Sequence, residues 1–184
     1  MENQKIRVGV LFGGKSAEHE ISLKSAKNVI EALDKSKYEA ILMAIDKTGK
    51  WCYNEDSLLL SNAKGELSIN PDHEVVSLIP QSNGLLSSTS NLGFSKKIDV
   101  VFPILHGPFG EDGTIQGLLK LANVPFVGAG VLGSAVGMDK DIMKRLLRDV
   151  NLPLGKYVSL QDHEERPTFE SITEKLGAPC FVKP

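Results

Sequence analysis

The first part of the chain has the hydrophobic pattern of a strand, a helix and a second strand. An apolar run rich in strand formers extends from Ile6 to Phe12 and stops at Gly13-Gly14. Ser22 is expected to cap a helix, because apolar residues then recur at helical spacing as far as Leu33. The apolar run Tyr38–Ile45 predicts the next buried strand. Such a βαβ unit favours a parallel sheet with helices on both faces.

The pattern is less regular between residues 46 and 97. Turn signals and short apolar runs in this region predict an antiparallel excursion on the βαβ scaffold. Its strands are expected at Trp51–Tyr53, Val75–Ile79 and Leu85-Leu86. The small polar tract at 87–90 is typical of a surface loop.

Regular elements return after residue 98, where buried strands and amphipathic helices alternate again. The apolar positions of the helix that Asp139 would cap are expected to face inward. A strand at the end, with no closing element after it, indicates that the chain is part of a longer protein. The predicted elements are Val100–Leu105 (strand), a helix from Thr114, Val124–Val127 (strand), a helix capped by Asp139, Tyr157–Leu160 (strand), Phe169–Leu176 (helix) and Cys180–Lys183 (strand).

Composition narrows the class of protein. The length of 184 residues fits one domain or somewhat more. The composition, with 41% hydrophobic and 24% charged residues, argues against a disordered chain. With 21 basic and 23 acidic residues, the chain lacks the basic excess of a nucleic-acid binder. The longest apolar run, Ala40–Ile45, is far short of the ~20 residues of a membrane helix. The chain shows no export signal and has only two cysteines, Cys52 and Cys180. Both features favour a location in the reducing cytoplasm.

Residues Gly9–Ser16 formally satisfy the phosphate-binding pattern G-x-x-x-x-G-K-[ST]. A P-loop NTPase or kinase built on this segment is therefore an alternative function. However, a phosphate-binding loop needs free backbone N–H groups in its middle residues. Here these include Val10, Leu11 and Phe12, which belong in a buried strand, and Lys15 would then be a solvated side chain.

Two loops that follow predicted strands carry candidate chemistry. Glu18 lies in the first loop, where a carboxylate can pair with the ammonium group of a small substrate, or simply face a helix N-terminus. The second loop, His106–Gly113, combines three glycines and a proline with ionisable residues, and strand-end loops often carry function. Its histidine can donate to a carboxylate or oxyanion, whereas Glu111 and Asp112 would cap the following helix. No zinc-ligand spacing is present.

Two lysines are candidates for phosphate binding. Lys140 follows Met138-Asp139, and Lys183 lies in the terminal segment Phe181–Pro184. A lysine at the end of a buried strand needs an anion beside its ammonium group, and nucleotide phosphate is one such anion. Either lysine alone would more often be a solvated surface residue.

Taken together, these segments resemble the D-alanine–D-alanine ligases of the ATP-grasp group. The resemblance rests on four stretches in the family's order, and the likeness covers essentially the whole chain. The stretches are Phe12–Leu23, Leu105–Gly117, Met138–Lys144 and Phe181–Pro184.

The resemblance implies a fold, a division into domains and a role for each candidate residue. It implies a pre-ATP-grasp, Rossmann-like α/β substrate domain over 1–127, followed by the start of an ATP-grasp α+β domain over 128–184. Glu18 would bind the ammonium of the first D-alanine, with His106 and Gly107 beside that substrate. Lys140 and Lys183 would contact ATP phosphates.

The implied reaction is ATP-dependent formation of D-alanyl-D-alanine through an acyl phosphate, for peptidoglycan precursors. ATP and Mg²⁺ are the implied cofactors, with the metal ligands beyond residue 184, so that the chain alone is expected to be inactive. A cytoplasmic homodimer is implied as well. Besides the P-loop alternative, another ATP-grasp carboxylate–amine ligase and a non-catalytic binding module stay open, as does the choice between D-alanine and a D-hydroxy acid as second substrate.

Overall fold

The computed structural model describes residues 4–53, 59–61, 65, 67–88 and 90–183. The chain divides into two compact units, Met1–Met138 and Asp139–Pro184. The predicted domain boundary after residue 127 stays a prediction. The described elements of the first unit are β1 (Ile6–Gly13), α1 (His19–Ala32), β2 (Tyr38–Ile45), β3 (Trp51–Tyr53), β4 (Leu59–Ser61), β5 (Leu67–Ile69), β6 (Glu74–Leu78), β7 (Leu85–Ser88), β8 (Ser95–Lys97), β9 (Val100–Leu105), α2 (Thr114–Leu121) and α3 (Val131–Met138).

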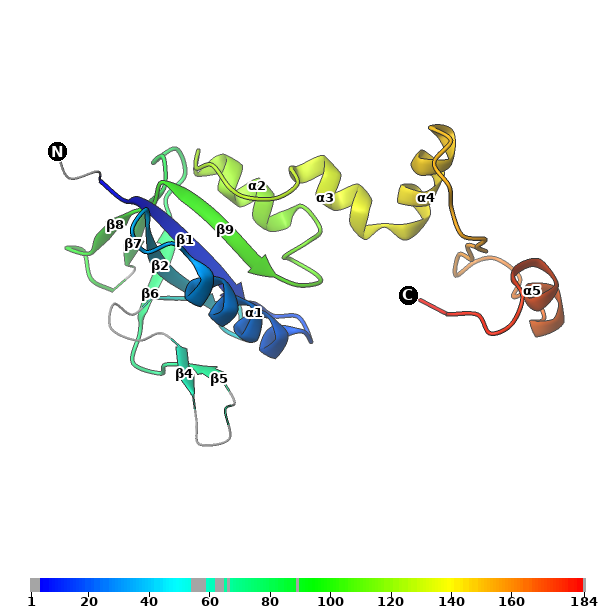
Figure 1. Ribbon diagram of the computed structural model, residues 1–184, viewed down its shortest axis with the longest axis horizontal. Coiled ribbons are helices and arrows are strands. Elements are labelled where there is room, and N and C mark those ends of the chain that lie inside the picture. The colour runs from blue at the N-terminus through cyan, green and yellow to red at the C-terminus, as the bar shows by residue number, and fades with distance from the viewer. Residues whose placement is uncertain (1–3, 54–58, 62–64, 66, 89, 184) are drawn as a thin grey trace. The chain divides into compact units, whose positions relative to one another are not determined.

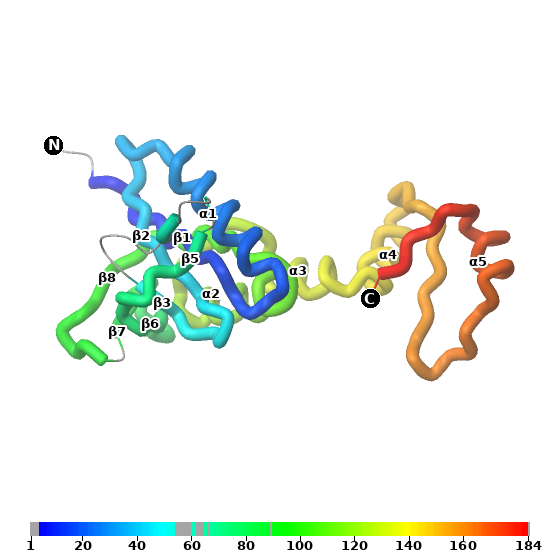
Figure 2. Tube along the Cα trace, turned by 90° about the horizontal axis from the view of Figure 1, so that it is seen from below, coloured from blue at the N-terminus to red at the C-terminus, as the bar shows by residue number. Residues whose placement is uncertain are grey.

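The first unit is built on a mixed sheet whose parallel strands, β2, β1 and β9, lie together at one end (Figure 1). Its described strands lie in the order β8-β7-β6-β3-β2-β1-β9. Strand β1 pairs in parallel with both β2 and β9, and the strands from β3 to β8 in this sheet add on antiparallel beyond β2. The predicted α/β fold with its antiparallel excursion is therefore confirmed. A separate antiparallel pair, β4–β5, packs through Leu67 and Ile69 onto the core that α1 also covers, and β5 lies close to α1 (Figure 2).

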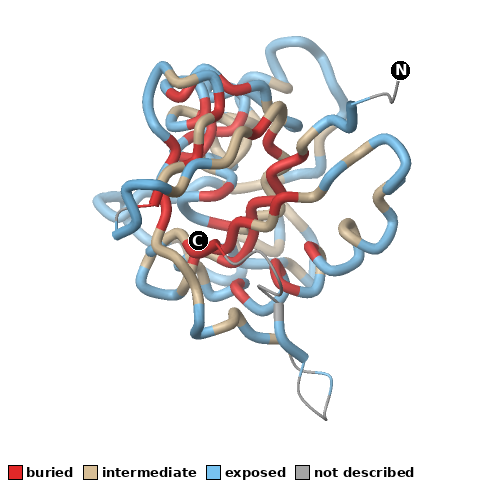
Figure 3. Tube along the Cα trace, turned by 90° about the vertical axis from the view of Figure 1, so that its left-hand side faces the viewer, coloured by how far each residue is buried: buried red, intermediate tan, exposed pale blue. Residues whose placement is uncertain are grey.

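Strand β1 lies at the centre of the core because its side chains alternate between two covered faces. Val10 and Phe12 pack with Leu23 of α1 on one face. Leu11 packs with Leu119 of α2 on the other face, and all five of these side chains are no more than 1% exposed. The buried segments run together through the middle of the unit (Figure 3). At about 25 cal/mol per Å² of buried apolar surface, this two-sided packing is the main stabilisation of the sheet.

Strand β9 is the edge of the sheet, which explains how it accommodates a proline. Val101 turns its backbone groups outward, donating to the Pro125 carbonyl (2.8 Å) and accepting from the Val127 amide (2.9 Å). Pro103 lies two residues further on and faces the same open side, so β1 loses no hydrogen bond. The segment 124–127 makes one bridge, between Phe126 and Val101, and the prediction of a strand there was wrong.

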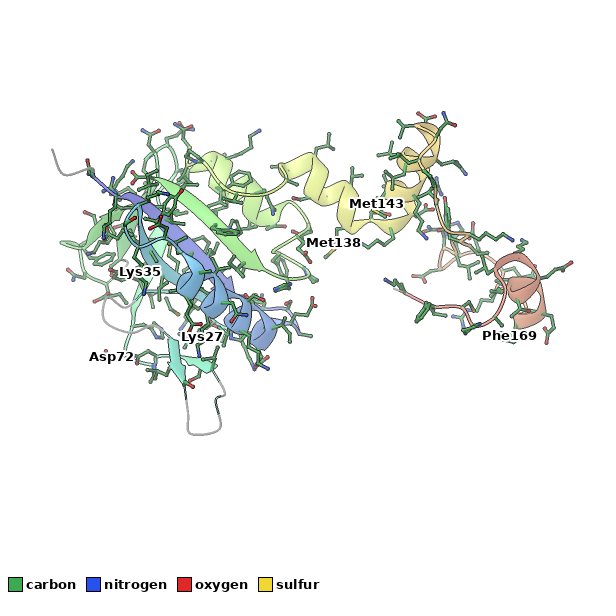
Figure 4. The ribbon with its side chains drawn as sticks, viewed as in Figure 1. Lys27, Lys35, Asp72, Met138, Met143 and Phe169 are labelled. Carbon is green, nitrogen blue, oxygen red and sulfur yellow. The ribbon has the colours of Figure 1, made fainter. Side chains whose placement is uncertain are left out.

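Three local predictions in the first unit need correction. Helix α1 begins at His19, four residues earlier than expected, and Ser22 is a buried residue inside it rather than its cap. Ser87 and Ser88 belong to β7 and not to a surface loop. Helix α3, rich in glycine, was not predicted. Lys27, which pairs with Glu31 at 3.8 Å, lies on the solvent face of α1 (Figure 4).

The second unit contains two described helices, α4 (Lys140–Asp149) and α5 (Phe169–Leu176). Asp139 caps α4 as predicted, accepting hydrogen bonds from the Asp141 and Ile142 amides, and Gly177 ends α5 at φ 86°. None of the residues described in this unit forms a strand, so the strands expected at 157–160 and 180–183 are absent from it.

The apolar side of α4 is not covered within this unit, so the expected inward positions were wrong. Leu146 is 51% exposed, Val150 63% and, on α5, Phe169 67%. Phe169, the first residue of α5, is labelled in Figure 4. A strand needs a partner for its backbone groups, and an apolar helix face needs a sheet or helix to cover it. The described residues of this unit supply neither.

Candidate active site

Two loops lie side by side at the carboxyl ends of the parallel strands β1 and β9. Residues 14–18 follow β1 and residues 106–113 follow β9, and these two strands are neighbours and parallel. A Cβ atom added to Gly107 would lie 3.2 Å from Glu18 Oε2 and 3.4 Å from the Ser16 Cβ. The structure therefore brings Glu18 and Gly107 together, as ligand sites at strand ends require.

The first loop is shaped by backbone contacts that only glycine permits. Gly13 has φ 90°, and an added Cβ atom would lie 2.3 Å from the Ile45 carbonyl oxygen. The next amide, of Gly14, donates to that same carbonyl at 2.7 Å, and the His19 Nδ1 donates to the Gly14 carbonyl at 2.7 Å. The chain thus turns sharply into α1. Glu18 occupies the N-cap position with its side chain exposed, where the helix dipole stabilises a carboxylate.

The second loop is held by its own carboxylates. Glu111 Oε2 accepts a hydrogen bond from the Gly107 amide (2.7 Å), and Asp112 accepts from the amides of Phe109 (2.8 Å) and Thr114 (3.0 Å). Partial burial would raise the pKa of Asp112, but these backbone donors outweigh it and lower the pKa. Both carboxylates therefore serve the loop's conformation, which leaves Glu18 as the carboxylate available to a ligand.

His106 lies beside a cavity next to this pair of loops. The cavity has a volume of about 240 Å³, and its lining includes Trp51, His106 and Phe109. Among the residues that the structure describes, no hydrogen-bond partner reaches the buried His106 Nε2. Because a buried polar nitrogen without a partner is costly, this atom is suited to bind a ligand group.

The geometry argues against a P-loop at Gly9–Ser16. Val10, Leu11 and Phe12 are paired in register with both β2 and β9, so their backbone groups belong to the sheet. Lys15 is exposed and lies over the Phe109 ring, 5.4 Å from its centroid. A cation–π contact of this kind leaves the ammonium facing an aromatic ring rather than a phosphate cradle.

The two predicted ATP lysines belong to the second unit. Lys140 is the first residue of α4, and Lys183 lies in the irregular segment after α5. Both side chains are exposed. Their proposed contact with phosphate stays a prediction. Within the described ranges, no cluster of three or more His, Cys, Asp or Glu side chains could hold a metal ion.

The sequence interpretation missed the role of Ser22. Its hydroxyl is fully buried, and it connects the last residue of β1 to the backbone of β9. The signal was available, because Ser22 and Ala26 are one helical turn apart on the same buried face.

The parallel strands β1 and β9, with Glu18 and the His106 loop at their carboxyl ends, define an α/β domain with a candidate ligand site. A family model described as "D-ala D-ala ligase N-terminus" matches residues 7–129. The chain therefore belongs to the D-alanine–D-alanine ligase family, as its sequence motifs predicted.

Individual relatives agree with this family membership. The chain is 48% identical to a D-alanine–D-alanine ligase of Oceanobacillus iheyensis over 98% of its length and 50% of the relative's. It is 44% identical to ligase A of Escherichia coli K12, covering 98% of this chain and 51% of that protein. The solved D-alanine–D-alanine ligase of Coxiella burnetii superposes with a TM-score of 0.79 at 32% identity, over 94% of this chain and 49% of that chain.

A further structural neighbour has a different named substrate. The VanG D-Ala:D-Ser ligase of Enterococcus faecalis superposes with a TM-score of 0.66 at 33% identity, over 83% of this chain and 44% of that chain. The chain spans about half the length of the curated relatives that it matches. None of the helices in the described part of the chain has the length and apolar character needed to cross a bilayer.

Proposed function

We propose that this chain provides the first amino-acid site of an ATP-dependent ligase that forms D-alanyl-D-alanine through an acyl phosphate. The observation that supports this proposal most directly is the approach of Glu18 to Gly107 at the carboxyl ends of β1 and β9. A free carboxylate beside a glycine backbone suits an amino acid, because the carboxylate pairs with its ammonium group and the glycine leaves room for its body. The relatives' names supply the identity of that amino acid.

His106 completes this proposed site. Its buried Nε2, which has no partner among the described residues, is a suitable donor to the carboxylate of the first D-alanine or to the phosphate that it acquires. A positioned donor stabilises negative charge that develops in the transition state.

ATP and Mg²⁺ are the proposed cofactors. The exposed ammonium groups of Lys140 and Lys183 suit phosphate contacts, since lysine binds phosphate as a point charge. From the family resemblance, we propose that the metal ligands lie beyond residue 184, in the part of the relatives that this chain does not span. We therefore propose that the 184-residue chain does not turn over alone.

The remaining parts of the proposal follow from the family. We propose a cytoplasmic enzyme of peptidoglycan precursor synthesis that acts as a homodimer, with D-alanine and ATP as its small-molecule partners. The second substrate is proposed to be D-alanine. The neighbour named as a D-Ala:D-Ser ligase makes D-serine the competing choice.

The test is phosphate release from ATP by the full-length protein. Release should require D-alanine and should not be supported by L-alanine, while the isolated 184-residue chain should release none. Substituting D-serine for half of the D-alanine and identifying the dipeptide by mass distinguishes the two second substrates. ATP turnover without any amino acid would instead support another nucleotide-dependent enzyme. Binding of D-alanine without any ATP turnover would support a binding module.

A further inference from the structure

One hydroxyl group connects the two strands that end at the proposed site. Ser22 lies in the first part of α1 and is 0% exposed. Its Oγ accepts a hydrogen bond from the Gly13 amide at 2.7 Å and donates to the Ile104 carbonyl. Gly13 is the last residue of β1. Ile104 lies on β9, two residues before His106.

The same residue also contacts the backbone of Glu18. The Ser22 amide donates to the Glu18 carbonyl at 3.0 Å, within the first turn of α1. Ser22 therefore touches the end of β1, the end of β9 and the residue that carries the candidate carboxylate. These are the three backbone points that determine how far Glu18 lies from the His106 loop.

Nothing in helix propensity favours a serine at this buried position. Serine is a mediocre former of helix interiors, and a buried hydroxyl is costly unless it is fully hydrogen-bonded. Here the hydroxyl both accepts and donates, and without it the Gly13 amide would lose its partner at the strand end.

We infer that Ser22 is a positioning residue, which sets the separation of the Glu18 and His106 loops through its bridge from Gly13 to Ile104. The inference rests on the proposed function, because the two loops are taken to bind the first D-alanine. Small misplacements of binding groups reduce reactivity strongly, so the effect should appear in the D-alanine dependence.

The experiment compares Ser22→Ala and Ser25→Ala in the full-length protein. Ser25 is a half-buried serine on the same helix and takes no part in the bridge, which makes it a matched control. In Ser22→Ala, the D-alanine concentration for half-maximal phosphate release should rise about tenfold, with the ATP concentration for half-maximal release unchanged. Hydrogen exchange in the peptide containing Gly13 should also become faster. Ser25→Ala should change neither quantity.

The inference would be overturned if Ser22→Ala left the D-alanine concentration for half-maximal release unchanged. An equal rise in the half-maximal concentrations of D-alanine and ATP would overturn it as well. If Ser22→Ala does not fold, Ser22→Cys keeps a weak donor and acceptor and should show the same selective change at smaller size. If the wild-type protein releases no phosphate with D-alanine, the proposed function fails. The exchange at Gly13 still reports separately whether the bridge exists.

Discussion

At the scale of single residues, the first loop depends on one glycine whose geometry excludes every other residue. Gly13 has φ 90°, and a Cβ atom added to it would lie 2.3 Å from the Ile45 carbonyl oxygen. Both obstacles are backbone features, so no side-chain movement relieves them. The turn that presents Glu18 therefore requires glycine at this position.

We predict that Gly13→Ala lowers the free energy of unfolding by about 3 kcal/mol, because it adds strain and a backbone clash. Urea unfolding of the 184-residue chain, followed by the fluorescence of its single tryptophan, Trp51, measures this change in the first unit. Gly117→Ala is the control, since Gly117 lies within α2 with no heavy atom within 4 Å of an added Cβ. That variant should gain about 0.5–1 kcal/mol. Equal effects of the two substitutions would contradict the geometric argument.

A second residue-scale feature is the ion pair between Arg7 and Asp99, at the amino ends of β1 and β9. Asp99 accepts from the Arg7 backbone amide (2.8 Å), Nε (2.9 Å) and Nη2 (2.8 Å), which ties the residue before β9 to β1. The guanidinium hydrogen bonds lower the pKa of Asp99 to about 2. A bidentate pair with an additional backbone donor is among the stronger ion pairs.

The lowered pKa predicts a loss of stability in acid. The carboxylate stabilises the folded state fully above its ordinary value of 3.8, and the contribution is lost as pH falls through about 2. Since the side chain is 34% exposed, we expect a contribution of about 1 kcal/mol at pH 7. Urea unfolding of wild type and Asp99→Asn should differ by this amount at pH 7 and converge near pH 2. A constant difference across this range would show that the charge is unimportant.

At the scale of elements, the antiparallel excursion is part of the main core. Strand β3 lies between β2 and β6, and its Cys52 is 0% exposed. Burial raises the pKa of the Cys52 thiol to about 11. The thiolate, which is the reactive form, is therefore scarce at neutral pH.

We predict that iodoacetamide at pH 8 modifies Cys180 and leaves Cys52 unmodified in the folded chain. Cys180 is half-buried in the second unit, whereas Cys52 lies inside the sheet. Mass spectrometry of tryptic peptides distinguishes the two sites, and full modification of both in urea is the control. Rapid labelling of Cys52 without denaturant would mean that β3 does not pack as the structure shows.

Elements with strong local patterns were predictable from the sequence, and those that depend on distant partners were not. Strands β1, β2 and β9 and helix α2 were placed correctly, because each has a long apolar run or a clear helical period. The segments 124–127 and 180–183 are apolar enough for strands, but 124–127 makes only one bridge to β9, and none of the described residues of the second unit forms a strand that could pair with 180–183. Helix α3 was missed because its glycines hide a helical pattern.

The position of the candidate residues at the ends of strands was predictable from the sequence, and the geometry around them was not. Glu18 and His106 were identified because each follows a buried strand, and parallel strands bring such loops to one edge. The approach of Glu18 to Gly107 and the bridge through Ser22 depend on the register of β1 and β9. No local pattern records that register.

At the scale of the whole molecule, the two units hold different parts of the proposed chemistry. The first unit carries Glu18 and His106, and the second carries both candidate phosphate lysines. The second unit also exposes apolar side chains on α4 and α5, and the chain spans about half the length of its curated relatives. These observations support the proposal that the 184-residue chain does not turn over alone.

The most direct test of the central claim is the D-alanine dependence of phosphate release by full-length Glu18→Gln, measured beside Glu20→Gln. Glu20 is the matched control, because it lies two residues away and pairs with Lys47 (2.5 Å) instead of approaching Gly107. Glu18→Gln should raise the half-maximal D-alanine concentration by about 10- to 100-fold, since it removes the charge that pairs with the substrate ammonium. Glu20→Gln should leave it unchanged. Equal D-alanine dependence in Glu18→Gln and wild type would contradict the account.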